Sequence, residues 1–300
     1  MYNIIGKKKI WFTFSGILVV LSIIALLFWG LRFGIDFTGG SLLEVSYPQT
    51  RPATHQIEEA LAEFELQSLR IQPSDQNEYL LRFDNVDEAT HQSILQKLNT
   101  IELEGIEDNA ILENRFESIG PIIGSELKSK AIESIIIVLI FIVLYIAYAF
   151  RKVSKPVASW KYGLSAIIAL VHDILIVTGI FSALGFFLKI EVDSLFVTAL
   201  LTILGFSVHD TIVTFDRTRE NLFKNPDKSF NDIVNISVNQ TIVRSINTSV
   251  TTLFVLLSIY IFGGASIKNF VLALILGVII GTYSSIFIAS PLLAIWRKSK

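Results

Sequence analysis

Six apolar runs dominate the 300-residue sequence. We place them at residues 10–31, 131–150, 162–187, 194–215, 242–262 and 270–295. Each is long enough to cross about 30 Å of hydrocarbon, for which roughly 20 helical residues suffice. A chain in lipid must satisfy its backbone hydrogen bonds internally, so these runs predict membrane-spanning helices. The mean hydropathy of +0.58 is too high for a soluble globule and agrees with this prediction.

The first run follows three lysines, Lys7 to Lys9, as a signal peptide would. It is longer than a typical signal core, and no clear small-residue cleavage site follows it, so we favour an uncleaved span. Lys and Arg gather in one set of short flanks, which predicts that this side and both termini are cytoplasmic. Those flanking residues are Lys7–Lys9, Arg151, Lys152, Lys155, Lys161, Arg217, Arg219, Lys224, Lys228, Arg297, Lys298 and Lys300.

This orientation predicts four segments. Residues 1–31 form the cytoplasmic N-terminus and first span, 32–128 an extracytoplasmic domain, 129–296 a five-helix membrane region and 297–300 a cytoplasmic tail. The pattern within 32–128 predicts strands and helices in the order β-α-β-β-α-β, as in ferredoxin-like domains. We expect strands at 41–47, 69–71, 79–83 and 111–119, and helices at 54–64, capped by Thr54, and at 86–98. His55 and His91 are predicted to face solvent from these helices.

Charged residues within the apolar runs are the strongest functional signal. Asp210 lies late in the fourth run, Arg244 lies early in the fifth, and Asp173 follows His172 in the third. A charge at the centre of a membrane helix costs roughly 2.5–3.5 kcal/mol or more, so it is seldom present without a use. At 1.5 Å per residue, Asp210 lies about 10 Å and Arg244 about 9 Å from the cytoplasmic ends of their spans.

This depth match predicts an ionised pair on neighbouring helices. An arginine beside a carboxylate favours its charged form, so separating the two promotes protonation and couples it to helix movement. We therefore interpret Asp210, Arg244 and Asp173 as parts of a proton path, with His172 and His209 as possible relays. A static buried pair is the alternative for Asp210 and Arg244. The fifth run also carries a polar stripe that we expect to face the bundle interior, where it could equally be hydrogen-bonding glue: Arg244, Asn247, Thr248, Thr251 and Ser258.

Two glycine-containing motifs favour structural roles. The sequence GIDFTGG, residues 34–40, follows the first span and predicts a turn or hinge built on Gly34, Gly39 and Gly40, with Asp36 as a cap. A phosphate-binding loop is the alternative, but no lysine follows at the required spacing. In the sixth run, small residues recur at intervals of four and predict a close-packing helix face: Gly277, Gly281 and Ser285.

Several other functions are disfavoured. The chain has no cysteine and no His-Glu-x-x-His motif, so we expect neither a metal nor another cofactor. Its net charge of −2 gives no bulk attraction to nucleic acid. An intramembrane aspartyl protease dyad of Asp173 and Asp210 is a possible enzyme, but the usual Gly-x-Gly-Asp context is absent, so we do not expect an enzyme.

Four segments carry a resemblance to a known family. GIDFTGG at 34–40, ALVHDILIVTGIF around His172 and Asp173, GFSVHDTIVTFDRTREN at 205–221 and NQTIVRSINTSVTTL at 239–253 resemble the SecF family of protein-export membrane proteins. The resemblance covers nearly the whole chain. It implies half of a resistance-nodulation-division transporter, with six transmembrane helices and one ferredoxin-like extracytoplasmic domain. In that family Asn often precedes the aspartate of the fourth span, whereas this chain has His209.

The resemblance also implies a function. It assigns Asp210 as the proton-transfer carboxylate and Arg244 as its basic partner. It implies a separate subunit of the bacterial cytoplasmic membrane that pairs with SecD and associates with the SecYEG channel. There it would use the proton gradient to promote late steps in export of an unfolded polypeptide. The alternative on the same architecture is half of a small-molecule or lipid exporter, although such pumps usually have twelve spans and larger outer domains.

Overall fold

The computed structural model describes residues 1–74, 77–101, 110–150 and 158–296. Contacts divide the chain into two units. One contains Met1–Arg32 and Ile132–Lys300, and the other is Phe33–Ala131. The side of the membrane on which each unit lies stays a prediction. The same holds for the four predicted segments.

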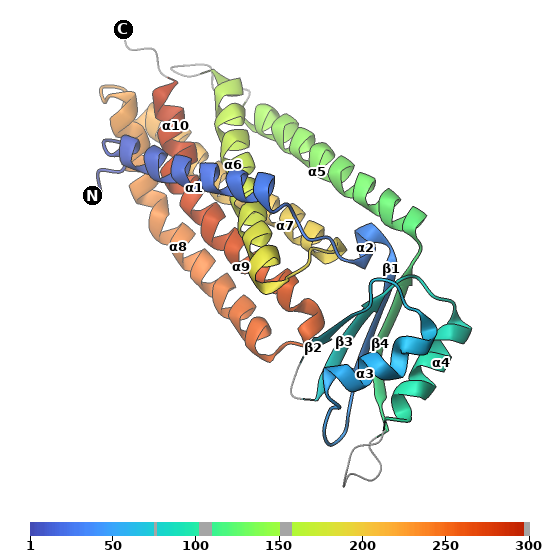
Figure 1. The fold of residues 1–300 in the computed structure, drawn as a ribbon. Helices are drawn as coiled ribbons and strands as arrows, with labels where there is room; N and C mark the ends of the chain where they lie inside the picture. The colour runs from blue at the N-terminus through green and yellow to red at the C-terminus, as the bar shows by residue number, and fades with distance from the viewer. Residues whose placement is uncertain (75–76, 102–109, 151–157, 297–300) are drawn as a thin grey trace. The chain divides into compact units, whose positions relative to one another are not determined.

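The smaller unit is built on a four-stranded antiparallel sheet with the order β2-β3-β1-β4 (Figure 1). Chain order β1-α3-β2-β3-α4-β4 and this strand order define the ferredoxin-like arrangement, as predicted. Its elements are α2 (Ile35–Thr38), β1 (Gly40–Ser46), α3 (Thr54–Leu61) with a 3₁₀ turn (Ala62–Phe64), β2 (Arg70–Pro73), β3 (Glu78–Phe83), α4 (Glu88–Asn99) and β4 (Leu112–Ile119).

One face of this sheet is packed under helices α3 and α4. Alternate residues of β1 and β3 turn inward because side chains alternate between the two faces of a strand. They meet the apolar stripes of the helices in one cluster. Its fully buried members include Leu43 and Leu81 from the strands, Ile57 from α3, and Ile94 from α4. These contacts fix the positions of both helices on the sheet.

Three local predictions for this unit are wrong. Ala53, not Thr54, is the N-cap of α3, and the Gln56 side chain accepts a hydrogen bond from its backbone N–H at 2.8 Å. Asp36 lies in the first turn of α2 rather than at its cap, which is Gly34. His91 is buried at 3% exposure, because it shares the inward stripe of α4 with Ile94 and Leu98. His55 is exposed, as expected.

The larger unit is a bundle of helices. They are α1 (Lys8–Phe28), α5 (Pro121–Ala149), of which residues 121–131 belong to the smaller unit, α6 (Ser159–Leu188), α7 (Ser194–Lys224), α8 (Phe230–Phe262) and α9 (Ala265–Ser284), which continues through a π-helical segment (Ser285–Ala289) into α10 (Ser290–Ile295). In the described residues, six helical stretches are long and apolar enough to cross a membrane. With α9 and α10 counted as one span, they coincide with the six predicted runs.

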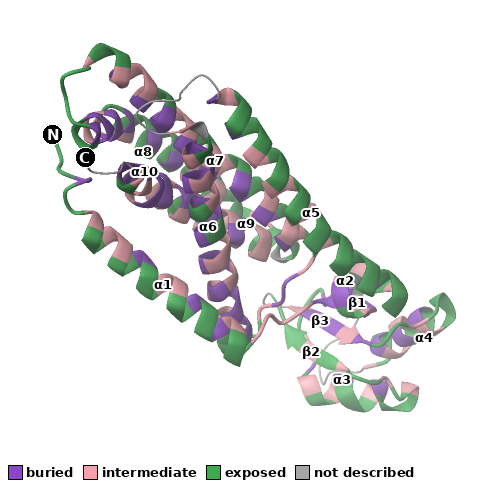
Figure 2. Ribbon diagram, turned by 90° about the horizontal axis from the view of Figure 1, so that it is seen from above, coloured by how far each residue is buried: buried purple, intermediate pink, exposed green. Residues whose placement is uncertain are grey.

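Burial differs strongly among these helices (Figure 2). α9 contacts α6, α7 and α8, and about half of the apolar windows of α6, α7 and α9–α10 is buried. In α1, α5 and α8 that share is 17% or less. α6, α7 and α9 therefore form the centre of the bundle, while α1, α5 and α8 each present most of their surface outward from this chain.

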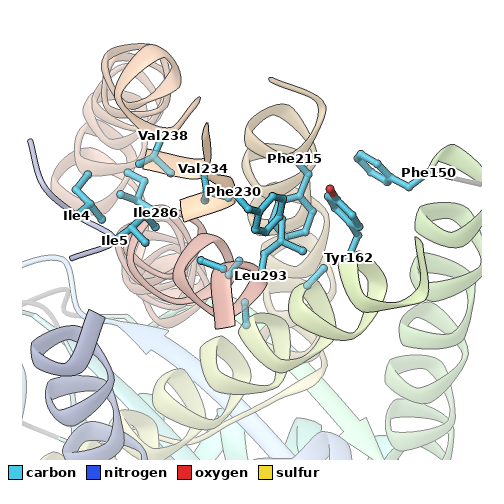
Figure 3. Close-up of a cluster of buried hydrophobic side chains, with 14 of the residues drawn as sticks. Ile4, Ile5, Phe150, Tyr162, Phe215, Phe230, Val234, Val238, Ile286 and Leu293 are labelled. Carbon is cyan, nitrogen blue, oxygen red and sulfur yellow. The ribbon is translucent and has the colours of Figure 1, made fainter. Parts of the chain in front are cut away.

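One end of the bundle holds its main apolar core (Figure 3). Phe150 stacks on Tyr162 with ring centroids 5.2 Å apart, and Phe215 meets Tyr162 edge-on at 5.3 Å. Ile4 and Ile5 join this core from the N-terminal segment. The segment is held there because Asn235 of α8 accepts hydrogen bonds from both of their backbone N–H groups.

Several helices extend beyond their predicted runs, among them α5, which begins at Pro121. α7 continues to Lys224 and α8 begins at Phe230, since hydropathy marks only the apolar part of each helix. Beyond that part, the Asn221 side chain donates hydrogen bonds to Ser237 and Gln240 across the α7–α8 pair. Arg217 and Glu220 form an exposed ion pair at 2.7 Å. Arg151, Lys152, Lys155 and the predicted tail 297–300 lie outside the described residues.

Candidate functional site

Asp210 is a buried acid on α7, with 5% of its surface exposed. Its Oδ2 atom is buried and has no hydrogen-bond partner among the residues that the structure describes. The carboxyl group interacts with the hydroxyl of Ser245, on α8, and with the charges of His209 and Arg244. Because buried carboxyl oxygens are nearly always hydrogen-bonded, this unpaired oxygen makes Asp210 a candidate functional residue.

The neighbouring helix brings Arg244 to the site but not into an ion pair. α7 and α8 are in contact, as the sequence predicted for consecutive spans. Within the described residues, no ion pair of 4.0 Å or less joins Asp210 and Arg244, and Arg244 is exposed. The closed pair expected from depth matching is therefore not formed in this conformation. The physical reason lies in the facing of α8, which turns Ser245 inward and Arg244 outward.

The polar stripe of α8 also faces away from the bundle that this chain forms. Asn247, Thr248 and Thr251 are exposed, as is Ser258, which corrects the expected inward orientation. A second stripe is buried in its place: Ser237, Thr241, Ser245 and Ser249. Small hydroxyl side chains let two helices approach, and the buried stripe contains no residue as long as Arg244 or Asn247 of the outward stripe. The Thr241 and Thr214 hydroxyls, 3.1 Å apart, and the hydrogen-bonded Ser249 and Thr282 hydroxyls show that close approach.

Asp173 on α6 has a different environment. It is fully buried and accepts hydrogen bonds from helices on two sides. The Ser207 hydroxyl of α7 donates to Oδ2 at 2.6 Å, and the Ser284 hydroxyl of α9 donates to the same oxygen at 2.8 Å. His172 Nδ1 lies 2.9 Å from Oδ1. These partners tie α6, α7 and α9 together around one carboxylate.

The two histidines of the predicted relay are not equivalent. His172 is 6% exposed, and its Nε2 atom has no partner among the described residues. His209 is exposed, on a different side of α7 from Asp210, as expected from a helical turn of about 100° per residue. The structure thus joins His172 to Asp173, and places His209 near Asp210 without a hydrogen bond between them.

Glycines in α9 allow the helices around Asp173 to touch. A Cβ on Gly277 would lie 2.1 Å from Ile203 Cγ1, and one on Gly281 would lie 2.9 Å from Ser207 Cβ. Ser285 is buried, and its hydroxyl donates to Thr282 O within its own helix. The two glycines therefore bring α7 against α9 at the level of the serines that bind Asp173.

The GIDFTGG segment contains two glycines with backbone conformations that favour glycine. Gly39 has φ of 76° and Gly40 has φ of 129°. A Cβ on Gly39 would also lie 2.7 Å from Pro121 Cα, and one on Gly124 would lie 2.8 Å from Gly39 N. Within the smaller unit, Gly39 therefore lies in close backbone contact with the first turn of α5, while a Cβ on Gly40 would lie 2.9 Å from Phe83 O. Gly34 has an ordinary φ of −78°.

Hydrolytic chemistry finds no support in this arrangement. Within the described ranges, no group of three His, Cys, Asp or Glu residues could hold a metal ion. No hydrogen bond joins the Asp173 and Asp210 carboxyl groups there, and Asp173 is occupied by His172, Ser207 and Ser284. A protease dyad, in which two carboxyls share a proton, is not formed between them.

Comparisons with known proteins assign the chain to a family. Residues 99–299 match the family model described as "Protein export membrane protein SecD/SecF, C-terminal". Residues 24–50 match the "SecD/SecF GG Motif", which includes the glycines described above. The protein translocase subunit SecF of Thermobaculum terrenum is 42% identical, over 99% of this chain and 94% of the relative. That of Anaerolinea thermophila is 36% identical, over 100% and 96%.

Solved structures show the same fold. The crystal structure of SecDF, a translocon-associated membrane protein from Thermus thermophilus, matches 98% of this chain with a TM-score of 0.82 and 30% identity. SecDF in its super-membrane-facing form matches with a TM-score of 0.68 and 29% identity. This chain covers 38% of each of those longer chains. The chain belongs to the SecD/SecF family of protein-export membrane proteins, on the branch whose members are named protein translocase subunit SecF.

Proposed function

We propose that this chain is an accessory subunit of the Sec protein translocase, coupled to the proton motive force through Asp210. It works with a SecD subunit in the bacterial cytoplasmic membrane, with both termini cytoplasmic, and promotes late steps of export through the SecYEG channel. The moving substrate is an unfolded polypeptide. It is not an enzyme, and it needs no cofactor.

One observation carries this proposal: among the described residues, a buried carboxyl oxygen of Asp210 has no hydrogen-bond partner, and Arg244 of the neighbouring helix forms no ion pair with it. Such a group costs free energy in either state. If Arg244 closes on it, the ion pair stabilises the carboxylate; if Arg244 stays away, protonation removes the buried charge. Protonation of Asp210 and approach of Arg244 are therefore alternative ways to stabilise the same carboxyl group. Proton binding is thus coupled to movement between α7 and α8, as a proton-driven motor requires.

The exposed polar stripe supports the partnership with SecD. Arg244, Asn247, Thr248 and Thr251 lie on a helix apolar enough to span a membrane, yet they face away from this chain. Lipid tails offer these groups no hydrogen bonds, and a cation there is costly. A helix from another membrane subunit satisfies them, and the match to the longer SecDF chain supports SecD as that subunit.

The decisive test is Asp210→Asn, which keeps the size of the side chain but removes its proton. In vesicles that contain this chain, SecD and the SecYEG channel, we expect proton-gradient-dependent export to be lost while assembly with SecD persists. Export driven without the gradient serves as the internal control. Normal gradient-dependent export by the variant would refute the proposal.

A matched substitution separates charge from packing. Asp216→Asn changes an exposed acid six residues further along α7, where Asp216 pairs with Arg219 at 3.5 Å. We expect export by this variant to remain close to wild type, because an exposed pair contributes at most about 1 kcal/mol. A drug- or lipid-accumulation assay tests the exporter alternative. If this chain exported a small molecule, cells that carry the Asp210→Asn variant would accumulate that molecule.

A further inference from the structure

The His172–Asp173 pair has an arrangement that the motor described above does not use. Asp173 receives two serine hydroxyls on one oxygen and His172 Nδ1 on the other. An ionised carboxylate accepts all three hydrogen bonds at once, whereas a protonated one keeps them only by donating its own hydrogen to Nδ1. The imidazole hydrogen would then lie on Nε2, a buried atom with no partner among the described residues. Because buried N–H groups are seldom left unpaired, the arrangement favours Asp173 as a carboxylate.

That carboxylate sets the tautomer of His172. Because Nδ1 lies 2.9 Å from an ionised oxygen, the imidazole hydrogen belongs on Nδ1. Nε2 then keeps its lone pair, and this atom is buried without a partner among the described residues. The ring lies against Tyr283 of α9, with centroids 6.3 Å apart and an angle of 25° between the planes. Nε2 is thus a proton acceptor with an unused lone pair.

The net charge of the His172–Asp173 pair favours proton uptake at Nε2. With neutral imidazole, the pair carries a net charge of −1 in the centre of the bundle. Uptake of one hydrogen ion forms a single N–H bond at Nε2, breaks no bond in the protein and brings the net charge to zero. In the part of the chain that the structure describes, the side chains that interact with Asp173 are His172 on its own helix, Ser207 on α7 and Ser284 on α9, and neither serine carries a charge. Neutralising a buried charge is electrostatically favourable.

We propose that His172 and Asp173 form a second, single-proton site, in which His172 Nε2 takes up the proton and Asp173 is a positioning residue that stays ionised. This inference rests on the proposed function. It connects to Asp210 through α7, because Ser207 lies three residues before Asp210, about 4.5 Å along the helix. The Thr211 hydroxyl also donates to the Ser207 carbonyl at 3.2 Å.

The tautomer gives a test that does not depend on export. The full chain, labelled with ¹⁵N-histidine and placed in lipid nanodiscs, contains four histidines, and His172→Gln identifies the His172 signals by their loss. We expect the Nδ1–H tautomer for neutral His172. In Asp173→Asn the new amide donates to Nδ1, so the proton moves to Nε2. An Nε2–H tautomer in wild type, or no change in Asp173→Asn, overturns the proposal.

Export provides the second readout. His172→Gln keeps an amide that can bond to Asp173 but cannot titrate. We expect gradient-driven export to fall by roughly tenfold or more and to lose one step of its pH profile. His55→Gln, an exposed histidine of the sheet unit, is the matched control and should behave as wild type. If Asp210→Asn abolishes gradient-driven export but His172→Gln leaves it unchanged, this inference fails alone; if both variants export normally, the proposed function itself fails.

Discussion

Two buried acids in the same bundle have opposite environments. Asp173 is held by donors from α6, α7 and α9, so its carboxylate is saturated. Asp210, three residues beyond Ser207 on α7, has a buried oxygen with no partner in the described residues. A carboxylate with all its hydrogen bonds made stabilises one arrangement of the helices. A carboxyl group with an unpaired oxygen is stabilised further by a second arrangement that provides a partner. The comparison therefore separates the acid that positions helices from the acid that responds to their movement.

The largest expected effect breaks the saturated site. Asp173→Ala leaves two buried serine hydroxyls and an imidazole N–H without their acceptor, and we expect a loss of about 3–5 kcal/mol in unfolding free energy. Asp210→Ala should change it by about 1 kcal/mol or less, since it removes a poorly satisfied charge. Unfolding of the full chain in mixed micelles that contain an increasing fraction of a denaturing detergent measures the change in unfolding free energy for both variants. Equal losses would remove the distinction between the two acids.

The next effect dissects the donors. Ser207→Ala removes one hydrogen bond to an ionised group, for which we expect about 1.5–3 kcal/mol. Ser245→Ala, beside Asp210, is the matched change and should alter stability by less while it changes gradient-driven export. The same unfolding assay and the vesicle export assay measure the two variants. A larger stability loss in Ser245→Ala would contradict the assignment of roles.

A packing change sharpens the comparison without touching a polar group. Gly277→Ala places a methyl group 2.1 Å from Ile203 and should cost about 1–3 kcal/mol, because α7 must move away from α9. Gly205→Ala is the control on α7, where no described atom outside its own helix lies within 4 Å of the new Cβ. It should be neutral or slightly stabilising, since alanine favours helix. Similar behaviour of both variants would show that this contact is not tight.

The smallest effect concerns an exposed acid of the sheet unit. Asp87 caps α4 by accepting a hydrogen bond from Thr90 N at 2.9 Å, and bonding to Thr90 lowers its pKa below the usual 3.8. A lowered folded-state pKa gives stability that is present above the unfolded pKa and lost as the pH falls through the folded value. Amide exchange in α4 should therefore accelerate in that acid range. In Asp87→Asn, which caps without titrating, the acceleration should be weaker; an identical pH profile would exclude this cap as the cause.

The sequence predicted the architecture well because hydropathy and period report directly on fold. Apolar length located six spans, and alternation located the strands of the ferredoxin-like unit. The contact between α7 and α8 also followed from their order. The partners of Asp173 could not be predicted, since Ser207 and Ser284 lie 34 and 111 positions away and are two among many serines.

The facing of α8 was the main misreading. It carries two polar stripes, one of hydroxyls that includes Ser245 and one that begins at Arg244, and periodicity alone does not say which of them is buried. The buried stripe consists of Ser and Thr alone, whereas the outward stripe also contains Arg244 and Asn247. His91 differs from its prediction for another reason: its spacing with Ile94 and Leu98 places it on the inward face of α4, where its ring stacks on Phe116 with centroids 3.6 Å apart.

The outward guanidinium of Arg244 has a consequence for copies of this subunit that lack a partner. A copy that reaches the bilayer alone leaves that cation facing acyl chains, at a cost of roughly 2.5–3.5 kcal/mol or more if it lies at full depth. A copy that finds its companion does not bear that cost. We therefore expect copies of this subunit without a partner to be less stable in the bilayer than copies within the complex.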